Sequence, residues 1–260
     1  MPTVDLATGT LHFRRAGAGS PLLLLHANPG DSRDYEAVFT ALAAHFDVIA
    51  PDWPGYGASA PLAGEAASAM ALHRTLTGFL DALGLERVAL IGNSVGGYAA
   101  ARLAIEQPQR VSKLVLVSPG GFTPHNTLTR LFCRWQGSPA GLPPALMARL
   151  YLHRHTPVAD AMRARATAEQ SAPAARQLNR AIWRSFMAGE HDLRAAARTI
   201  RCPTLLVFGS FDPLIPFWRD GRAARRALPH AHYLRFATGH APFAEAPDEF
   251  LAGVLPFLRG

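Results

Sequence analysis

A serine lies between glycines at the point where an apolar stretch gives way to an alanine-rich one. Residues 88–91 are Val-Ala-Leu-Ile, a short apolar run typical of a buried parallel strand. Residues 98–107 are rich in alanine and end just before Pro108, which predicts a helix. The connecting residues 92–97 read Gly-Asn-Ser-Val-Gly-Gly. Small residues two positions before and after Ser94 fit the sharp strand-to-helix turn called a nucleophile elbow, which raises the serine hydroxyl above the sheet edge.

Two further strand ends carry side chains that an activated serine requires. Asp212 follows the strand-like residues 203–208, and His240 follows the strand-like residues 232–236. Because functional groups gather at the carboxyl ends of the strands in open α/β sheets, we expect both to lie near Ser94. A serine hydroxyl is a poor nucleophile unless a histidine accepts its proton and a carboxylate orients the imidazole. The sequence therefore predicts a catalytic triad in the chain order Ser, Asp, His.

Together with the strand-like residues 22–25, these segments resemble the α/β-hydrolase superfamily, from about residue 10 to the C-terminus. Residues 52–59 resemble the family's D-x-x-G-x-G-x-S loop, and residues 239–247 resemble its G-H-x-x-x-x-E-x-P signature. The family commonly has His-Gly in the loop after the strand at 22–25, where this chain has His26-Ala27. Alanine is small enough to preserve that loop.

The resemblance also implies how an oxyanion is bound. Two backbone N–H groups, those of Asn28 and Val95, would form the oxyanion hole, and the helix N-terminus behind Ser94 favours negative charge there. No metal or organic cofactor is required. Haloalkane dehalogenases and epoxide hydrolases also share features of this family, but they need an aspartate nucleophile where this chain has Ser94.

Strand and helix patterns alternate along the chain, which predicts right-handed crossovers and a mostly parallel eight-stranded sheet flanked by helices. The expected strands are 3–6, 10–15, 22–25, 46–50, 88–92, 113–117, 203–208 and 231–236. The expected helices are 34–45, 66–83, 95–107, 217–227 and 244–258.

A long insertion follows the sixth expected strand. Residues 122–198 are rich in Ala, Arg and Leu and are interrupted by Pro143, Pro144, Pro157 and Pro173, which predicts several short helices. The resemblance implies that this insertion is a helical cap over the serine. The predicted organisation is thus an α/β-hydrolase core of residues 1–121 and 199–260, with a cap of residues 122–198.

The cap supplies candidates for the substrate pocket, although most of its apolar residues are expected simply to pack it onto the core. The pocket residues predicted from both parts of the chain are Ala27, Phe132, Trp135, Trp183 and Leu214.

The net charge of +7 is concentrated in the same insertion. Residues 122–198 hold 11 Arg and four acidic residues, so their net charge equals that of the whole chain. A basic cap favours an acidic substrate or an acyl carrier protein, or it is a solvated helical surface. Nucleic acid is disfavoured as a partner because no binding motif accompanies the charge.

Targeting signals and metal-site patterns are not found in the sequence. No apolar run approaches the ~20 residues that span a bilayer, and the first residues lack the pattern of a signal peptide. The two cysteines, Cys133 and Cys202, have neither metal-ligand spacing nor a disulfide pattern, which favours a cytoplasmic location.

The function expected from these motifs is hydrolysis of a carboxylic ester of a small molecule through an acyl-enzyme on Ser94, as in carboxylesterases. Several alternatives stay open: thioesterase, lactonase, haloperoxidase-like and carrier-bound acyl ester esterase activity. Carbon–carbon bond hydrolases share the Gly-Asn-Ser-x-Gly-Gly elbow, but they commonly have tryptophan after the histidine, where this chain has Ala241. A different class of function is a small-molecule receptor with slow turnover.

Overall fold

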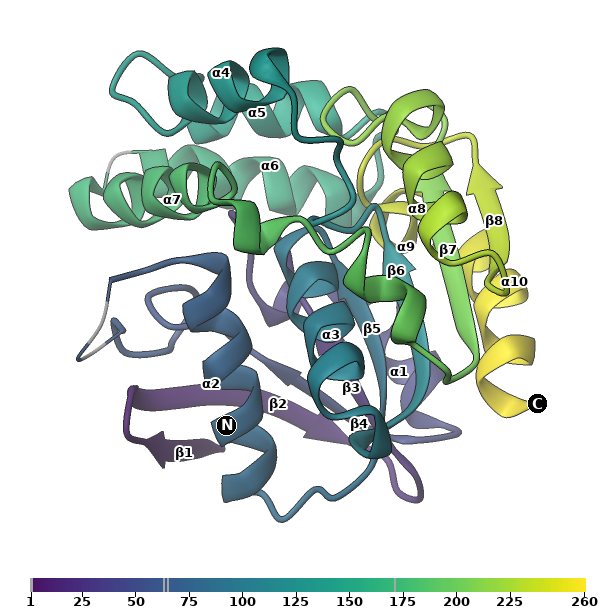
Figure 1. Cartoon of the computed structure of the whole chain (residues 1–260). Helices are drawn as coiled ribbons and strands as arrows, with labels where there is room; N and C mark the ends of the chain where they lie inside the picture. The colour runs from purple at the N-terminus through teal and green to yellow at the C-terminus, as the bar shows by residue number, and fades with distance from the viewer. Residues whose placement is uncertain (1, 63, 65, 171) are drawn as a thin grey trace.

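One twisted sheet of eight strands forms the centre of the molecule in the computed structural model, which describes residues 2–62, 64, 66–170 and 172–260 (Figure 1). The strands are β1 (Thr3–Leu6), β2 (Gly9–Ala16), β3 (Pro21–Leu25), β4 (Asp47–Pro51), β5 (Val88–Asn93), β6 (Val111–Val117), β7 (Thr204–Gly209) and β8 (His232–Phe236). Their order is β1-β2-β4-β3-β5-β6-β7-β8. Strand β2 pairs antiparallel with β1 and β4, and all other neighbours pair parallel.

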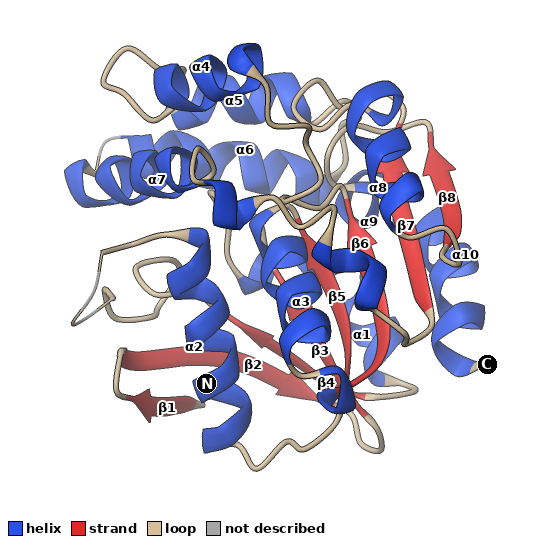
Figure 2. Ribbon diagram, in the orientation of Figure 1, coloured by secondary structure: helices blue, strands red, loops and turns tan. Residues whose placement is uncertain are grey.

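Helices cover both faces of this sheet (Figure 2). One layer contains α1 (Glu36–Ala43), α9 (Pro242–Glu245) and α10 (Pro247–Arg259), and the other contains α2 (Ala69–Ala82), α3 (Val95–Glu106) and α8 (Arg222–Ala227). Strand β3 shows why both faces are apolar: Leu22 and Leu24 belong to one buried cluster, and Leu23 and Leu25 belong to the other. The fold predicted from the sequence is confirmed.

Three predicted helices contain a turn or an interruption that was not expected, and a fourth, predicted as 66–83, begins at Ala69 after the N-cap residue Ser68. The segment predicted as 217–227 begins with a π-helical turn, Phe217–Gly221, before α8. The segment predicted as 34–45 begins with a 3-10 turn, Ser32–Tyr35. The segment predicted as 244–258 is interrupted at Ala246, because the ring of the following Pro247 disfavours helical backbone at the residue before it. Further 3-10 turns are Pro108–Arg110, Gly189–His191 and Ala196–Thr199.

Four helices lie between β6 and β7 in the chain and above the carboxyl ends of the strands (Figure 1). They are α4 (Thr127–Gln136), α5 (Pro144–Tyr151), α6 (Pro157–Gln170) and α7 (Pro173–Ser185). Three of them begin at a proline, whose fixed φ and missing N–H suit the first turn of a helix. Across the described residues, we find no helix long and apolar enough to span a membrane.

Candidate active site

Ser94 occupies the turn between β5 and α3 in a backbone conformation that few residues other than glycine adopt, with φ 54° and ψ −115°. The surrounding glycines are required by close backbone approach. A Cβ added at Gly92 would lie 2.5 Å from the carbonyl oxygen of Gly96, and one added at Gly96 would lie 2.3 Å from that of Leu25. The elbow predicted from the sequence is therefore present, with Ser94 only partly buried.

Asp212 and His240 meet beyond the ends of β7 and β8. The Asp212 carboxylate accepts a hydrogen bond from His240 Nδ1 at 2.6 Å, and its other oxygen accepts from the backbone N–H groups of Leu214 and Ile215 at 2.9 and 3.1 Å. Burial by itself raises the pKa of Asp212, but the neighbouring His240 and these hydrogen bonds outweigh it and lower that pKa below its usual value. Asp212 is thus a carboxylate, and it directs the proton of the imidazole to Nδ1, which leaves Nε2 free to act as a base.

The loop that carries His240 is held by a buried glutamate, Glu245. Its carboxylate accepts from the backbone N–H groups of Gly239 at 2.9 Å and Ala241 at 3.2 Å, on either side of the histidine. The same carboxylate accepts from the N–H groups of His153 and Arg154, at 2.7 and 2.8 Å, in the insertion. This explains the glutamate of the G-H-x-x-x-x-E-x-P signature: it fixes the position of the histidine.

Asn93 joins the serine and histidine segments directly. Its amide donates to the carbonyl oxygens of Val117 at 3.0 Å and of His240 at 3.1 Å. The backbone N–H of His240 donates to the carbonyl of Tyr151 at 2.7 Å. Asn93, the residue before Ser94, therefore connects the end of β6 to the loop that carries His240.

His26, at the end of β3, braces the next loop. Its Nε2 accepts from the backbone N–H of Trp53 at 2.9 Å, and its Nδ1 lies 2.7 Å from the carbonyl of Ala27. Burial lowers the pKa of this histidine, so it is neutral, with its proton on Nδ1. Asp52 braces the same region by accepting from the backbone N–H groups of Ser32 and Ala58 at 2.8 and 3.0 Å.

Asn28 and Val95, the residues predicted to supply the oxyanion hole, both line one cavity with Ser94. Val95 is the first residue of α3, where a backbone N–H has no acceptor within the helix. The Asn28 side chain is held by the Tyr56 hydroxyl, which donates to its carbonyl oxygen.

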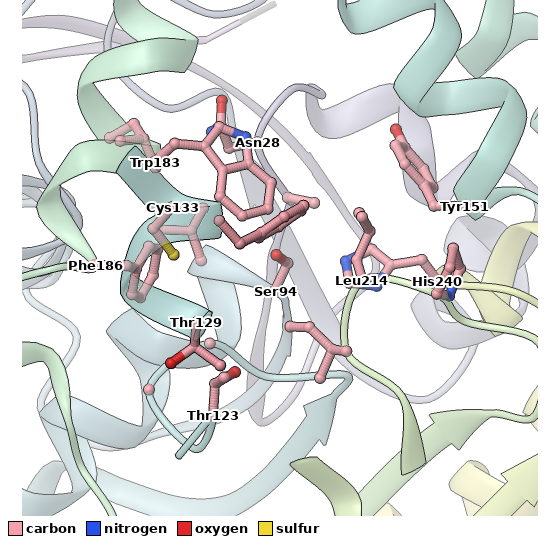
Figure 3. A pocket seen from close by; sticks show the side chains of 18 of the residues that line it. Asn28, Ser94, Thr123, Thr129, Cys133, Tyr151, Trp183, Phe186, Leu214 and His240 are labelled. Carbon is pink, nitrogen blue, oxygen red and sulfur yellow. The ribbon is translucent and has the colours of Figure 1, made fainter. Parts of the chain in front are cut away.

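The cavity has a volume of about 300 Å³ and lies between the sheet edge and the insertion (Figure 3). Ser94 and His240 both line it. Its remaining walls are formed by Ala27, Asn28, Val95, Gly120, Gly121, Thr123, His125, Leu128, Thr129, Arg130, Phe132, Cys133, Tyr151, Ile182, Trp183, Phe186, Pro213, Leu214, Ile215 and Arg219.

Four of the five predicted pocket residues line this cavity: Ala27, Phe132, Trp183 and Leu214. Trp135 does not. The residues of α4 that line the cavity lie between Leu128 and Cys133, and Trp135 lies beyond them, in the last turn of the helix. Trp135 is 40% exposed and contacts Phe132 from the side, with ring centroids 6.0 Å apart.

Sequence reasoning missed the polar residues of the cavity, above all Arg130 and Arg219. Neither belongs to a motif, so no local signal distinguishes them from the other arginines. No three His, Cys, Asp or Glu side chains are grouped as metal ligands in the described ranges of the chain.

The chain matches a family model described as alpha/beta hydrolase fold over residues 20–247. It is 36% identical over 121 residues to 2-hydroxy-6-oxo-6-phenylhexa-2,4-dienoate hydrolase of Comamonas testosteroni, a likeness that covers 45% of this chain and 42% of that relative. It is 30% identical over 220 residues to haloalkane dehalogenase 2 of Mycobacterium bovis, covering 80% and 77% of the two chains.

Solved structures show the same fold at lower identity. An esterase from Thermogutta terrifontis has a TM-score of 0.83 at 24% identity, with 99% of this chain and 97% of that chain covered. Because the family model spans most of the sequence, this chain belongs to the alpha/beta hydrolase fold family.

Proposed function

We propose that this protein is a serine hydrolase that cleaves a carboxylic ester of a small molecule through an acyl-enzyme on Ser94. The observation that carries the proposal is the contact between Asp212 and His240, at 2.6 Å, on the cavity that Ser94 also lines. This pairing would supply a general base at the same cavity as a nucleophile on a strained turn.

The reaction has two steps on this site. His240 Nε2 accepts the Ser94 proton as Oγ attacks the ester carbonyl, and the backbone N–H groups of Asn28 and Val95 bind the resulting oxyanion. The tetrahedral intermediate collapses as His240 donates that proton to the departing alcohol oxygen. Water, deprotonated by His240, then attacks the acyl-enzyme, and His240 returns that proton to Ser94 Oγ as the bond between Oγ and the acyl carbon breaks and the acid is released. Asp212 keeps the imidazole oriented and stabilises its charged form.

The insertion fits the role of a cap in this mechanism, with residues 1–121 and 199–260 as the hydrolase core and residues 122–198 above the serine. Its helices contribute Phe132, Trp183 and other apolar walls, which exclude water from the intermediate. A cavity of about 300 Å³ suits a small substrate.

Binding of an acyl carrier protein to the cap has weaker support, because several of its arginines have acidic partners within the protein. Arg154 pairs with Glu249 at 2.8 Å, and Arg194 pairs with Asp192 at 2.6 Å. These pairs reduce the charge available to an acidic protein surface.

The second candidate is cleavage of a carbon–carbon bond, which the Comamonas relative's name favours. The elbow is compatible with either reaction, but Ala241 follows the histidine, where carbon–carbon hydrolases commonly have tryptophan. We therefore favour the ester.

The test is to assay p-nitrophenyl esters of increasing acyl length with the wild type and Ser94→Ala. The proposal expects a serine-dependent burst of nitrophenol, followed by steady turnover. Hydrolysis of a 2-hydroxy-6-oxo-dienoate without ester turnover would favour the second candidate, and inactivity on both would favour a receptor.

A further inference from the structure

Arg219 is held at the wall of the cavity by a buried carboxylate. Its Nε donates to Asp220 at 2.8 Å, and its Nη2 lies 2.8 Å from the same carboxylate oxygen and 3.2 Å from the carbonyl of Leu214. Asp220 is fully buried, whereas the Arg219 side chain is 27% exposed. The ion pair therefore fixes the guanidinium through Nε and Nη2. The third nitrogen, Nη1, has no hydrogen-bond partner among the described residues.

A second arginine, Arg130 of α4, lines the same cavity. No acidic side chain pairs with its guanidinium in the described part of the chain. The other acidic groups nearby already have partners: Asp220 pairs with Arg219, and Asp212 with His240. With Arg219 balanced by Asp220, Arg130 leaves one positive charge uncompensated at the cavity, on an exposed side chain.

The cavity is also lined by Thr123, Thr129 and Cys133, which Figure 3 shows together with the aromatic side chains of Trp183 and Phe186. Arg219 is close enough to Cys133 to oppose, by its charge, the rise in the pKa of that thiol that burial causes. Thr123 lies beside the Asp220 carboxylate.

We propose that Arg219, positioned by Asp220 and assisted by Arg130, forms a subsite for a free carboxylate on the substrate. The preferred substrate would then be a half-ester of a dicarboxylic acid, with one carboxyl group esterified and the other ionised. A guanidinium presents planar N–H donors that match a carboxylate, and such charge-assisted hydrogen bonds are about twice as strong as neutral ones. This inference rests on the proposed function, because it concerns the substrate of the same site.

The test compares mono-p-nitrophenyl glutarate with p-nitrophenyl methyl glutarate, which differ in one charge. We expect the wild type to prefer the acidic ester by about tenfold or more in kcat/KM, chiefly through KM. The variant Arg219→Gln should remove most of this preference. The single variant Arg219→Gln leaves the Asp220 carboxylate buried and unpaired, which destabilises the fold. The double variant Arg219→Gln/Asp220→Asn removes both charges together, so it keeps the test valid if the single variant does not fold.

Arg222→Gln is the matched control, since Arg222 is an exposed arginine three residues further along that does not line this cavity. The Arg222→Gln variant should keep the wild-type preference for the acidic ester. Equal rates for the two esters in the wild type, or the same loss in Arg222→Gln, would overturn the subsite while leaving the ester hydrolase standing.

A calorimetric titration with glutarate separates the two proposals. If no ester is hydrolysed at all, the proposed function fails, but saturable glutarate binding that weakens in the double variant still supports the subsite. Absence of glutarate binding together with absence of turnover overturns both.

Discussion

The two sides of the candidate site are held in place by different means. On the sheet side, buried polar side chains fix each loop: Asp52, Asn93 and Glu245 each make two or more hydrogen bonds across the chain. On the insertion side, hydrogen bonds hold residues 151–154 beside the His240 loop, whereas the cavity wall formed by α4 and α7 is made of packed side chains, and Leu128 of α4 is 74% exposed. Hydrogen bonds define positions closely, whereas apolar packing tolerates substitution of similar volume. We therefore expect changes to the buried polar groups of the sheet side to affect turnover or stability, and changes to the apolar wall of the insertion side to affect which acyl chains are accepted.

The largest effect expected on the sheet side is that of Ser94→Ala. Turnover of p-nitrophenyl esters should fall by about 10⁵-fold or more, because the oxyanion hole and binding alone provide only residual catalysis. The unfolding transition in urea should be unchanged or shifted to higher urea, since alanine removes no hydrogen bond that supports the fold. Near-normal turnover by this variant would show that the triad is assigned wrongly.

The second effect concerns Glu245, which we expect to hold the catalytic histidine. Glu245→Ala leaves the N–H groups of Gly239, Ala241, His153 and Arg154 without their acceptor, and each buried donor left unpaired costs about 1–3 kcal/mol. The free energy of unfolding, from urea denaturation, should fall by at least about 3 kcal/mol.

Glu245→Gln is the control for that experiment, because an amide oxygen can still accept from the three N–H groups that share one carboxylate oxygen. It should be clearly more stable than the alanine variant. If both variants have the same free energy of unfolding as the wild type, the hydrogen bonds to Glu245 do not hold the loop that carries His240.

The difference between the two sides also explains what the sequence could predict. Ser94, Asp212 and His240 could be proposed because each follows a predicted strand and belongs to a local motif. The eight strands were located from strand-like runs and, for the first two, from the hairpin pattern around Thr8-Gly9. Trp135 does not line the cavity because the lining residues of α4 end at Cys133, and no local pattern records how far a cavity extends along a helix. Arg219 was missed for a related reason: its position depends on the π-helical turn Phe217–Gly221, where an ordinary helix was expected.

A third prediction tests the contact between the two sides. Arg165 of α6 lies 2.5 Å from Asp34 and 3.3 Å from Asp31, both buried in the segment after β3. Burial raises the pKa of Asp34 to about 7, from an ordinary value of 3.8, and the nearby charge of Asp31 adds to this rise, although Arg165 opposes it. Between pH 3.8 and about pH 7, the Asp34 carboxyl group is therefore protonated in the folded protein and ionised in the unfolded chain.

The contribution of Asp34 to stability is therefore greatest at low pH and is lost as the pH rises toward 7. The slope is at most about 1.4 kcal/mol per pH unit, and it vanishes above pH 7 for this group. Asp34→Asn should flatten the dependence, measured as the difference between variant and wild type in unfolding free energy at about pH 5 and about pH 8. A difference independent of pH would mean that Asp34 is ionised throughout.

The smallest effects are expected on the insertion side, where two tryptophans provide a matched pair. Trp183 lines the cavity, whereas Trp135 is partly exposed outside it. Trp183→Ala should enlarge the cavity and shift the preferred p-nitrophenyl ester to longer acyl chains, because removing an indole opens space for additional methylene groups. Trp135→Ala removes the same side chain from outside the wall, so kcat/KM across the same series should change by less than about twofold. Equal shifts in both variants would mean that the whole of α4 and α7 responds as one unit, and that the insertion determines selectivity through its position and not through single side chains.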